Sequence, residues 1–384
     1  MREKIWDVIV VGAGPAGSVA SKEIAKNGFD VLILEKKKIV GVPNHCGEGI
    51  TDEVLKELGY DDKKPWILRE VKGGRLIFPN NTTIYFPKRG FCIERPKFDQ
   101  ELAQEAISKG AELLTETKVE YVERKKDLWR IYTTKGRYLS HYLIAADGAS
   151  STIGRCLGVY HEYIDAVQYK FPPMERFKDD YLLFYHYEDF YPGYAWVFYR
   201  GIETSIGVGS VGKVRRKLEE FLKLLRIDPE KRITVQGGRV PFDRYPVRIV
   251  FPGVLFCGDA GGFLFPFTKG GVRGAIFSGK RAGEVISLAL KEDNPSLLYE
   301  YPKRVKPFPS RSRLHLLVPQ TFFSLNNEMV NLLGEIMDKK EYYRLPFFKG
   351  LKVFLKSPKP KNLYGIGIGF AVQRLYKRRE EFAW

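Results

Sequence analysis

A cysteine lies between a histidine and a glycine-rich turn in the segment His45-Cys46-Gly47-Glu48-Gly49. Thiol and imidazole side chains can bind a metal, act as a nucleophile or transfer a proton. The cysteines, at positions 46, 92, 156 and 257, form neither a CxxC pair nor a zinc pattern, so we predict no metal site. The neighbouring glycines favour a backbone held against a bound molecule, with inert burial of a lone cysteine as the alternative.

A glycine-rich turn near the N-terminus predicts a dinucleotide site. The sequence GxGxxG at 12–17 follows a continuously apolar run, residues 8–11, and precedes a helical pattern. In such a turn the first glycine allows the bend, the second lets a pyrophosphate approach and the third lets the helix pack on the strand. An acid at the end of the next strand can bind the ribose hydroxyls. The predicted contacts are Gly12, Gly14, Pro15, Ala16, Gly17, Glu35 and Lys36.

A second GxGxxG occurs at 207–212, before the basic helical stretch that starts at Lys213. Its strand has the pattern of an antiparallel hairpin with residues 194–199, whereas a dinucleotide turn needs a parallel strand. We therefore favour glycines in a sheet strand that another group approaches closely, and keep a second nucleotide site as the alternative.

Two further segments each end a buried strand at an aspartate, "IAADGASSTIGR" at 144–155 and "VLFCGDAGGFLFPFTKGGV" at 254–272. Together with the first turn, they resemble FAD-dependent oxidoreductases of the p-hydroxybenzoate hydroxylase type. That resemblance implies that Asp259 binds the ribityl chain and that Gly270 and Gly271 open a helix aimed at the flavin pyrimidine. The small residues Gly274, Ala275, Ser278 and Gly279 would let this helix pack closely. The expected cofactor contacts here are Asp147, Gly258, Asp259, Gly270, Gly271 and Val272.

Within that class the chain resembles archaeal geranylgeranyl reductases, through "CGEG" at 46–49, "ERPKFDQ" at 94–100, "GYAWVF" at 193–198 and "GDAGGFLFPFTKGG" at 258–271. The resemblance implies that the CGEG loop lies near flavin and substrate. It adds Cys46, Gly47, Gly49, Arg95 and Val119 to the cofactor contacts. The family usually has glycine where this chain has Lys269, and often a basic residue where it has His45. We expect Lys269 to point to solvent, with a charge beside reduced flavin as the alternative.

The reaction implied by the resemblance is reduction of an isolated prenyl C=C bond by hydride from reduced FAD, with a proton added to the other carbon. Cys46 and His45 are the candidate catalytic residues, and a water molecule is the alternative proton source. The candidate substrate-binding residues are Tyr194, Trp196 and Phe198, which alternate along one strand and so share a face. Ordinary sheet core is the alternative for these rings. Rival functions are an aromatic monooxygenase and a quinone-linked flavoprotein dehydrogenase.

The order of elements predicts an α/β fold: a Rossmann-like FAD-binding domain with an inserted antiparallel β-sheet substrate domain and a helical C-terminal region. The expected FAD-binding domain is discontinuous, comprising residues 1–72, 92–160 and 250–298. Residues 73–91 and 161–249 would form the β-rich substrate domain, including hairpins at 73–87 and around Gly201. Residues 299–384 would form the basic C-terminal region.

The composition, 44% hydrophobic and 28% charged residues in a chain of 384, is that of a soluble globular protein. We see no signal peptide and no apolar run of membrane-spanning length, and expect a cytoplasmic protein, possibly peripheral on the inner face of the membrane. The net charge is +17. Residues 301–384 contain 17 basic and 6 acidic side chains, with aromatic rings among the charges at 342–361. A solvated basic face with no partner is one interpretation. The functional alternatives are an acidic electron donor such as a ferredoxin and an anionic membrane surface, and both are favoured over nucleic acid.

Overall fold

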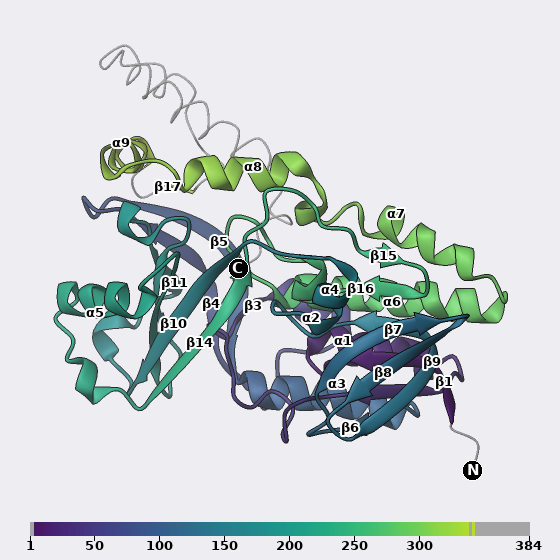
Figure 1. Cartoon of the computed structure of the whole chain (residues 1–384). Coiled ribbons are helices and arrows are strands. Elements are labelled where there is room, and N and C mark those ends of the chain that lie inside the picture. The colour runs from purple at the N-terminus through teal and green to yellow at the C-terminus, as the bar shows by residue number, and fades with distance from the viewer. Residues whose placement is uncertain (1–3, 338–339, 342–384) are drawn as a thin grey trace.

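The computed structural model describes residues 4–337 and 340–341 of the chain. Two sheets lie beside each other, helices pack against both, and residues 295–337 run across the top of the molecule (Figure 1). The predicted α/β architecture is confirmed. The first sheet carries the glycine turn. The second sheet contains the strands predicted for residues 161–249, which pair with one another antiparallel, but the sheet as a whole is mixed because β11 pairs parallel with β4.

The first sheet has the order β15-β16-β9-β1-β2-β6, with parallel pairing from β16 to β6. Its strands are β1 (Ile5–Val11), β2 (Val31–Leu34), β6 (Glu112–Leu114), β7 (Val119–Lys125), β8 (Leu128–Thr133), β9 (Gly136–Ala145), β15 (Val250–Phe251) and β16 (Val254–Phe256). β7, β8 and β9 form an antiparallel meander attached to this sheet. The helices that accompany it are α1 (Pro15–Ala25), α3 (Arg95–Ser108), α4 (Thr152–Leu157) and α6 (Val272–Lys291).

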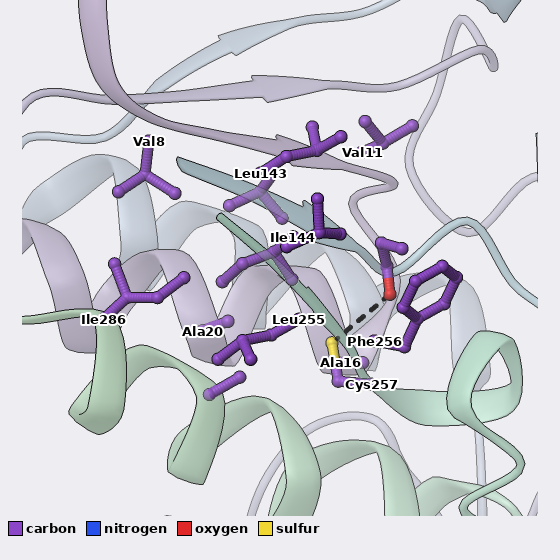
Figure 2. Packing of buried hydrophobic residues seen from close by; sticks show 14 of the residues in the cluster. Val8, Val11, Ala16, Ala20, Leu143, Ile144, Leu255, Phe256, Cys257 and Ile286 are labelled. Atoms are coloured by element: carbon purple, nitrogen blue, oxygen red, sulfur yellow. Dashed lines mark hydrogen bonds between the residues drawn. The ribbon is translucent and has the colours of Figure 1, made fainter. Parts of the chain in front are cut away.

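The core of this region forms where continuous apolar strands meet small residues on the helices. Val8, Leu143 and Leu255 are fully buried, as expected for strands covered on both faces. Figure 2 shows these side chains packed with Ala16 and Ala20 of α1 and Ile286 of α6. In the same view the Cys257 thiol lies 3.7 Å from the carbonyl oxygen of Ala145, so this cysteine belongs to the core.

Helices α1 and α6 touch through their backbones. A Cβ at Gly279 would lie 2.3 Å from the carbonyl oxygen of Ala16, and a Cβ at Gly283 would lie 2.7 Å from that of Ala20. At the start of α6, a Cβ at Gly274 would lie 2.0 Å from the carbonyl oxygen of Phe263. The predicted close packing of this helix through small residues is therefore confirmed.

The second sheet has the order β14-β10-β13-β12-β11-β4-β5-β17, with β3 on β5. Its strands are β3 (Gly49–Thr51), β4 (Ile67–Ile77), β5 (Thr83–Ile93), β10 (Tyr163–Phe171), β11 (Tyr181–Tyr185), β12 (Ala195–Tyr199), β13 (Thr204–Ser210), β14 (Thr234–Pro241) and β17 (Lys340–Glu341). Both predicted hairpins are present, one turning at Asn81 in the left-handed conformation and the other at Gly201. The sheet also includes β3 and residues 67–72, which the expected boundaries assigned to the FAD-binding domain.

The second GxGxxG lies on β13, which pairs antiparallel with β10 and β12. A Cβ at Gly207 would lie 2.2 Å from the Trp196 ring, so an indole occupies the space that a side chain would need. The favoured interpretation, glycines in a strand that another group approaches closely, is confirmed. The basic helix that follows, α5 (Val214–Leu224), packs on β10 and β13 through Leu218 and Phe221.

The remaining described helices are α2 (Asp52–Leu58), α7 (Tyr301–Val305), α8 (Arg313–Phe322) and α9 (Asn327–Met337). The last three confirm a mainly helical C-terminal region as far as it is described. The aromatic and basic stretch 342–361 lies outside the described residues. Among the helices described, none combines the length and the hydropathy needed to cross a bilayer.

We expect Gly279→Ala to lower the free energy of unfolding by about 1–3 kcal/mol, because the added methyl group meets the backbone of α1 and the helices must separate. Equilibrium urea denaturation of the purified variant would measure the change. The control is Lys280→Ala, which changes the next, half-buried residue of α6 and should stay within about 0.5 kcal/mol of the wild type. Equal stability of Gly279→Ala and wild type would contradict a backbone contact at this point.

Candidate active site

A cavity of about 400 Å³ is enclosed by the glycine turn, the CGEG loop and strands of the second sheet. Residues from both sheets and from the loop before α6 therefore meet around one space. Twelve of the candidate site residues line it: Gly14, Pro15, His45, Cys46, Gly47, Arg95, Tyr194, Trp196, Phe198, Asp259, Gly271 and Val272.

The glycine turn gives the cavity one wall. Gly12 has a φ of 102°, and a Cβ there would lie 2.4 Å from the carbonyl oxygen of Ala146. A Cβ at Gly17 would lie 1.9 Å from the carbonyl oxygen of Gly12, so the helix sits directly on the turn. Gly14 has no atom within 4 Å of its missing Cβ and faces the cavity. No side chain caps the N-terminus of α1, so its amide groups are open to an anion such as a pyrophosphate.

The N-terminus of α6 opens into the same cavity at Gly271, again without a side-chain cap. Asp259, on the short 3₁₀ helix Gly258–Gly261, lies against it: a Cβ at Gly271 would be 2.9 Å from Asp259 Oδ1. Burial raises the pKa of the Asp259 carboxyl. Two open helix N-termini and a buried carboxyl around one cavity fit FAD, which has a pyrophosphate, a polyol chain and a ring that gains negative charge on reduction.

His161 holds the turn that carries Asp259. Its Nδ1 lies 2.7 Å from Asp243 Oδ2, and its Nε2 lies 3.0 Å from the carbonyl oxygen of Ala260. Burial opposes a charge on this ring, but Asp243 outweighs the burial and raises the pKa of His161. In its protonated form the ring donates from both nitrogens, and these two contacts fix the turn. No local sequence pattern indicates this pair, because its members are separated by 82 positions.

Other candidate cofactor residues lie outside the lining: Gly12, Ala16, Gly17, Glu35, Lys36, Gly49, Val119, Asp147, Gly258 and Gly270. Glu35 accepts hydrogen bonds from the amides of Ala13 and Lys37, each at 2.8 Å, and so fastens the glycine turn to β2. Asp147 accepts from Ser151 Oγ and from the Thr152 amide, each at 2.6 Å, at the start of α4. Both carboxylates therefore accept hydrogen bonds from neighbouring protein groups, and neither lines the cavity.

The CGEG loop is fixed above the second sheet by polar contacts to β10 and β12. Gln168 Nε2 donates to the carbonyl oxygen of Cys46 at 2.8 Å, and Gln168 Oε1 accepts from Trp196 Nε1 at 3.2 Å. Gly47 lies on the Phe198 ring, where a Cβ would be 3.1 Å from the nearest ring atom. Cys46 is half-buried, and its sulfur accepts from the Glu48 amide at 3.2 Å. The thiol is thus held at the cavity wall.

A buried ion cluster lies directly beneath this loop. Glu48 Oε2 is 2.6 Å from Lys170 Nζ and 2.7 Å from Arg200 Nη1, and both cations also contact Glu203. The side chains of Glu48 and Arg200 are each 1% exposed. Glu48 has a φ of 66°, a conformation that side chains seldom adopt, so the cluster holds the loop in a strained turn. Burial lowers the pKa of Lys170, and Glu48 opposes that effect.

Arg95 and His45 approach the cavity on either side of Cys46. Arg95 pairs with Asp99 through two contacts of 3.0 Å and is 13% exposed. Burial opposes its charge, but Asp99 and then Cys46 raise the pKa of the guanidinium. His45 is exposed at the rim. Burial of its ring and then the charge of Lys37 lower the pKa of His45, which leaves the imidazole neutral at pH 7.

Three aromatic side chains form the opposite wall. The Tyr194 and Trp196 ring centroids are 6.2 Å apart, and those of Trp196 and Phe198 are 6.4 Å apart. Tyr194 also borders a smaller apolar cavity together with Phe184 and other rings. The wall continues from the main cavity toward α8.

The expectation that Lys269 points to solvent is wrong. This residue lines the cavity, and its Nζ donates to the carbonyl oxygen of Pro266 at 2.6 Å. The Nζ lies 4.1 Å from the centroid of the Phe242 ring and 5.4 Å from that of the Phe323 ring. Two rings from distant parts of the chain therefore cover a side chain that sequence alone places outside.

We expect Glu48→Gln to lower the free energy of unfolding by about 3 kcal/mol, because it leaves two buried cations short of a counter-charge. Urea denaturation would measure this change. The matched control is Glu70→Gln, since Glu70 pairs with Arg89 at the surface. The control should change stability by less than about 1 kcal/mol. Similar small effects in both variants would show that the cluster does not hold the loop.

Comparison with known proteins agrees with this geometry. The family model described as FAD binding domain matches residues 6–171. A solved structure from Thermoplasma acidophilum, described as geranylgeranyl bacteriochlorophyll reductase-like, superposes with a TM-score of 0.82 at 27% identity, over 98% of this chain and 100% of that one. A p-nitrophenol 4-monooxygenase from Pseudomonas putida shares the fold at 17% identity and a TM-score of 0.69, over 98% and 99% of the two chains. The predicted cofactor, FAD, is confirmed.

Among curated proteins, digeranylgeranylglycerophospholipid reductase 2 of Methanopyrus kandleri is 32% identical, over 88% of this chain and 92% of that protein. The digeranylgeranylglycerophospholipid reductase of Methanosarcina acetivorans is 30% identical, over 98% and 99% of the two chains. These relatives confirm the resemblance to archaeal geranylgeranyl reductases. The chain belongs to the digeranylgeranylglycerophospholipid reductase family.

Proposed function

We propose that this protein is an FAD-dependent oxidoreductase that saturates isolated C=C bonds in the geranylgeranyl chains of digeranylgeranylglycerophospholipids. The observation that carries the proposal is the composition of the cavity between the glycine turn and the second sheet. One side offers open helix N-termini and Asp259 to a flavin, and the other offers Cys46 and an aromatic wall to an apolar chain. Family membership supplies the substrate class.

FAD would be held by the turn at Gly14, by Asp259 and by the N-terminus of α6, and when reduced it supplies hydride. An isolated alkene develops no oxyanion that a protein could stabilise. The contribution of the chain is therefore orientation, exclusion of water and a placed proton. Tyr194, Trp196 and Phe198 orient the prenyl chain in this proposal. Cys46 and His45 stand beside the reacting carbons, and the neutral imidazole of His45 makes it a weak acid at pH 7.

An aromatic monooxygenase has less support. The monooxygenase of similar structure is 17% identical, which shows a shared fold alone. The wall of the cavity is hydrophobic and continues into a second apolar space, which suits a long chain better than a small polar phenol.

The proposal also covers the electron donor and the place of the protein in the cell. We infer a small acidic donor such as a ferredoxin, because the glycine turn at 12–17 is taken by FAD and the second GxGxxG is a sheet strand. The net charge of +17 would attract such a donor, and would also attract an anionic membrane surface from the cytoplasm.

The first test is a direct assay. Dithionite-reduced protein and a digeranylgeranylglycerophospholipid should give products that gain two hydrogens for each saturated bond, as measured by mass spectrometry. Asp259→Ala should lose most of its bound FAD, because the carboxyl lies at the cofactor wall. Unreduced lipid with a fully loaded, reduced wild type would contradict the proposed function.

We expect Cys46→Ser to keep its FAD and to reduce the lipid at least about tenfold more slowly, since a positioned group at the reacting bond is lost. The matched control is Cys156→Ser, which changes a half-buried thiol that does not line the cavity. Equal turnover of the two variants would make Cys46 a structural residue.

The donor is tested by stopped-flow reduction of bound FAD with soluble components. We expect ferredoxin to reduce it faster than NADPH does, with a rate that falls steeply as salt screens the attraction. Fast, saturable reduction by NADPH alone would overturn this part of the proposal. A ferredoxin rate independent of ionic strength would show that the basic surface does not guide the donor.

A further inference from the structure

Lys269 is a cavity residue in an unusual backbone position. It precedes the N-terminus of α6 by two residues and has a φ of 59°, in the left-handed region where glycine is favoured. A lysine in this backbone conformation costs free energy that a glycine would not. Such strain at a cavity points to a functional role for the side chain. That side chain lines the same cavity as Cys46 and Tyr194.

The ammonium group has few partners around it. Within the described residues it donates to the Pro266 carbonyl oxygen and lies against the rings of Phe242 and Phe323. Burial lowers the pKa of Lys269 to about 7, while Asp243 acts in the opposite direction. Near neutral pH this amine exists in both forms and can give up and regain a proton, which is the property of an effective general acid.

Other proton-bearing groups of the cavity are less suited to the task. Burial and then the charge of Cys46 raise the pKa of Tyr194, whose hydroxyl donates to the Thr268 carbonyl oxygen. The imidazole of His45 is neutral at pH 7 because its pKa is lowered. Arg95 is held in its charged form by Asp99. Asp259 lies at the cofactor wall, beside the N-terminus of α6.

We propose that Lys269 is the proton donor for alkene reduction. The inference rests on the proposed function. In the step, one alkene carbon receives hydride from reduced FAD and the π bond breaks. The other carbon receives the proton from Nζ of Lys269, which becomes a neutral amine, and FAD returns to its oxidised form. The amine then takes a proton from water. Burial of the amine away from water disfavours its charged form, which favours the transfer.

Charged groups around the amine set the pH at which it acts. Asp243 faces it and is itself paired with His161. Arg311 interacts with Asp243 from the chain before α8. Asp259 lines the same cavity. Because the protonated amine is the donor, wild-type reduction should fall as the pH rises above the pKa of Lys269, which burial lowers to about 7.

The test follows the reoxidation of dithionite-reduced enzyme by the prenyl lipid at several pH values, so that the physiological donor plays no part. Lys269→Met should bind FAD normally and be reduced by dithionite normally. Its reoxidation by lipid should be about 100-fold slower or more, and the fall above pH 7 should disappear. The matched control is Lys217→Met: burial also lowers the pKa of Lys217, but this residue lies outside the cavity lining. The control should keep both the rate and the fall.

A second variant and a second readout keep the outcome interpretable. Lys269→Gly removes the amine and relieves the left-handed backbone, so it should fold even if Lys269→Met does not. Independently of turnover, ¹⁵N NMR of the lysine side chains should show one amine that titrates near pH 7 and is missing in both variants.

The possible failures are distinct. A loaded, reduced wild type that leaves the lipid unreduced overturns the proposed function and this inference together. A wild type that reduces the lipid, with Lys269 variants that keep its rate and its pH dependence, overturns the proton donor alone. A pH dependence that persists in Lys269→Met and is lost in Cys46→Ser assigns the proton to Cys46 and likewise overturns the role of Lys269.

Discussion

Two helix N-termini can open into one cavity here only because α1 and α6 lie closer than ordinary side chains would permit. Glycine at 279 and 283 brings the α6 backbone against the carbonyl oxygens of α1, and Gly17 brings α1 against its own turn. The spacing of the turn at Gly14 and the start of α6 at Gly271 follows from those contacts. A protein interior transmits such contacts with little slack, because it is packed as densely as an organic crystal. The site for the cofactor is therefore a product of helix packing before any polar group is considered.

The substrate side is positioned by a different force. The CGEG loop reaches the second sheet through Glu48, and its strained turn persists because two buried cations and Gln168 hold it. The same sheet presents the aromatic wall on strand β12 and on Tyr194, the residue before it. Ionic contacts thus set where Cys46 lies, while ring packing sets the shape of the space that it faces. The two sets of contacts meet at Trp196, which bonds to Gln168 and also forms part of the wall.

Much of this arrangement could be predicted from the sequence because its signals are local. The turn at 12–17, the hairpins and the close packing of α6 each depend on residues a few positions apart. The antiparallel pattern around Gly207 likewise distinguishes a sheet strand from a second nucleotide site. The rest depends on residues far apart in the chain. Lys269 is buried by Phe242 and Phe323, and the ion cluster joins Glu48 to Lys170 across 122 positions. A lysine is usually exposed, so the general rule gave the wrong expectation for a residue that tertiary contacts enclose.

The charges beneath the CGEG loop add to zero, since Glu48 and Glu203 face Lys170 and Arg200. Mobile ions weaken attraction between exposed charges over about 10 Å at 0.1 M salt, but they hardly reach buried pairs. The outer surface of this protein, with its net charge of +17, therefore responds to ionic strength, and the loop beside Cys46 does not. A change in cellular salt therefore alters the attraction between the protein surface and charged molecules, while the position of the CGEG loop does not change.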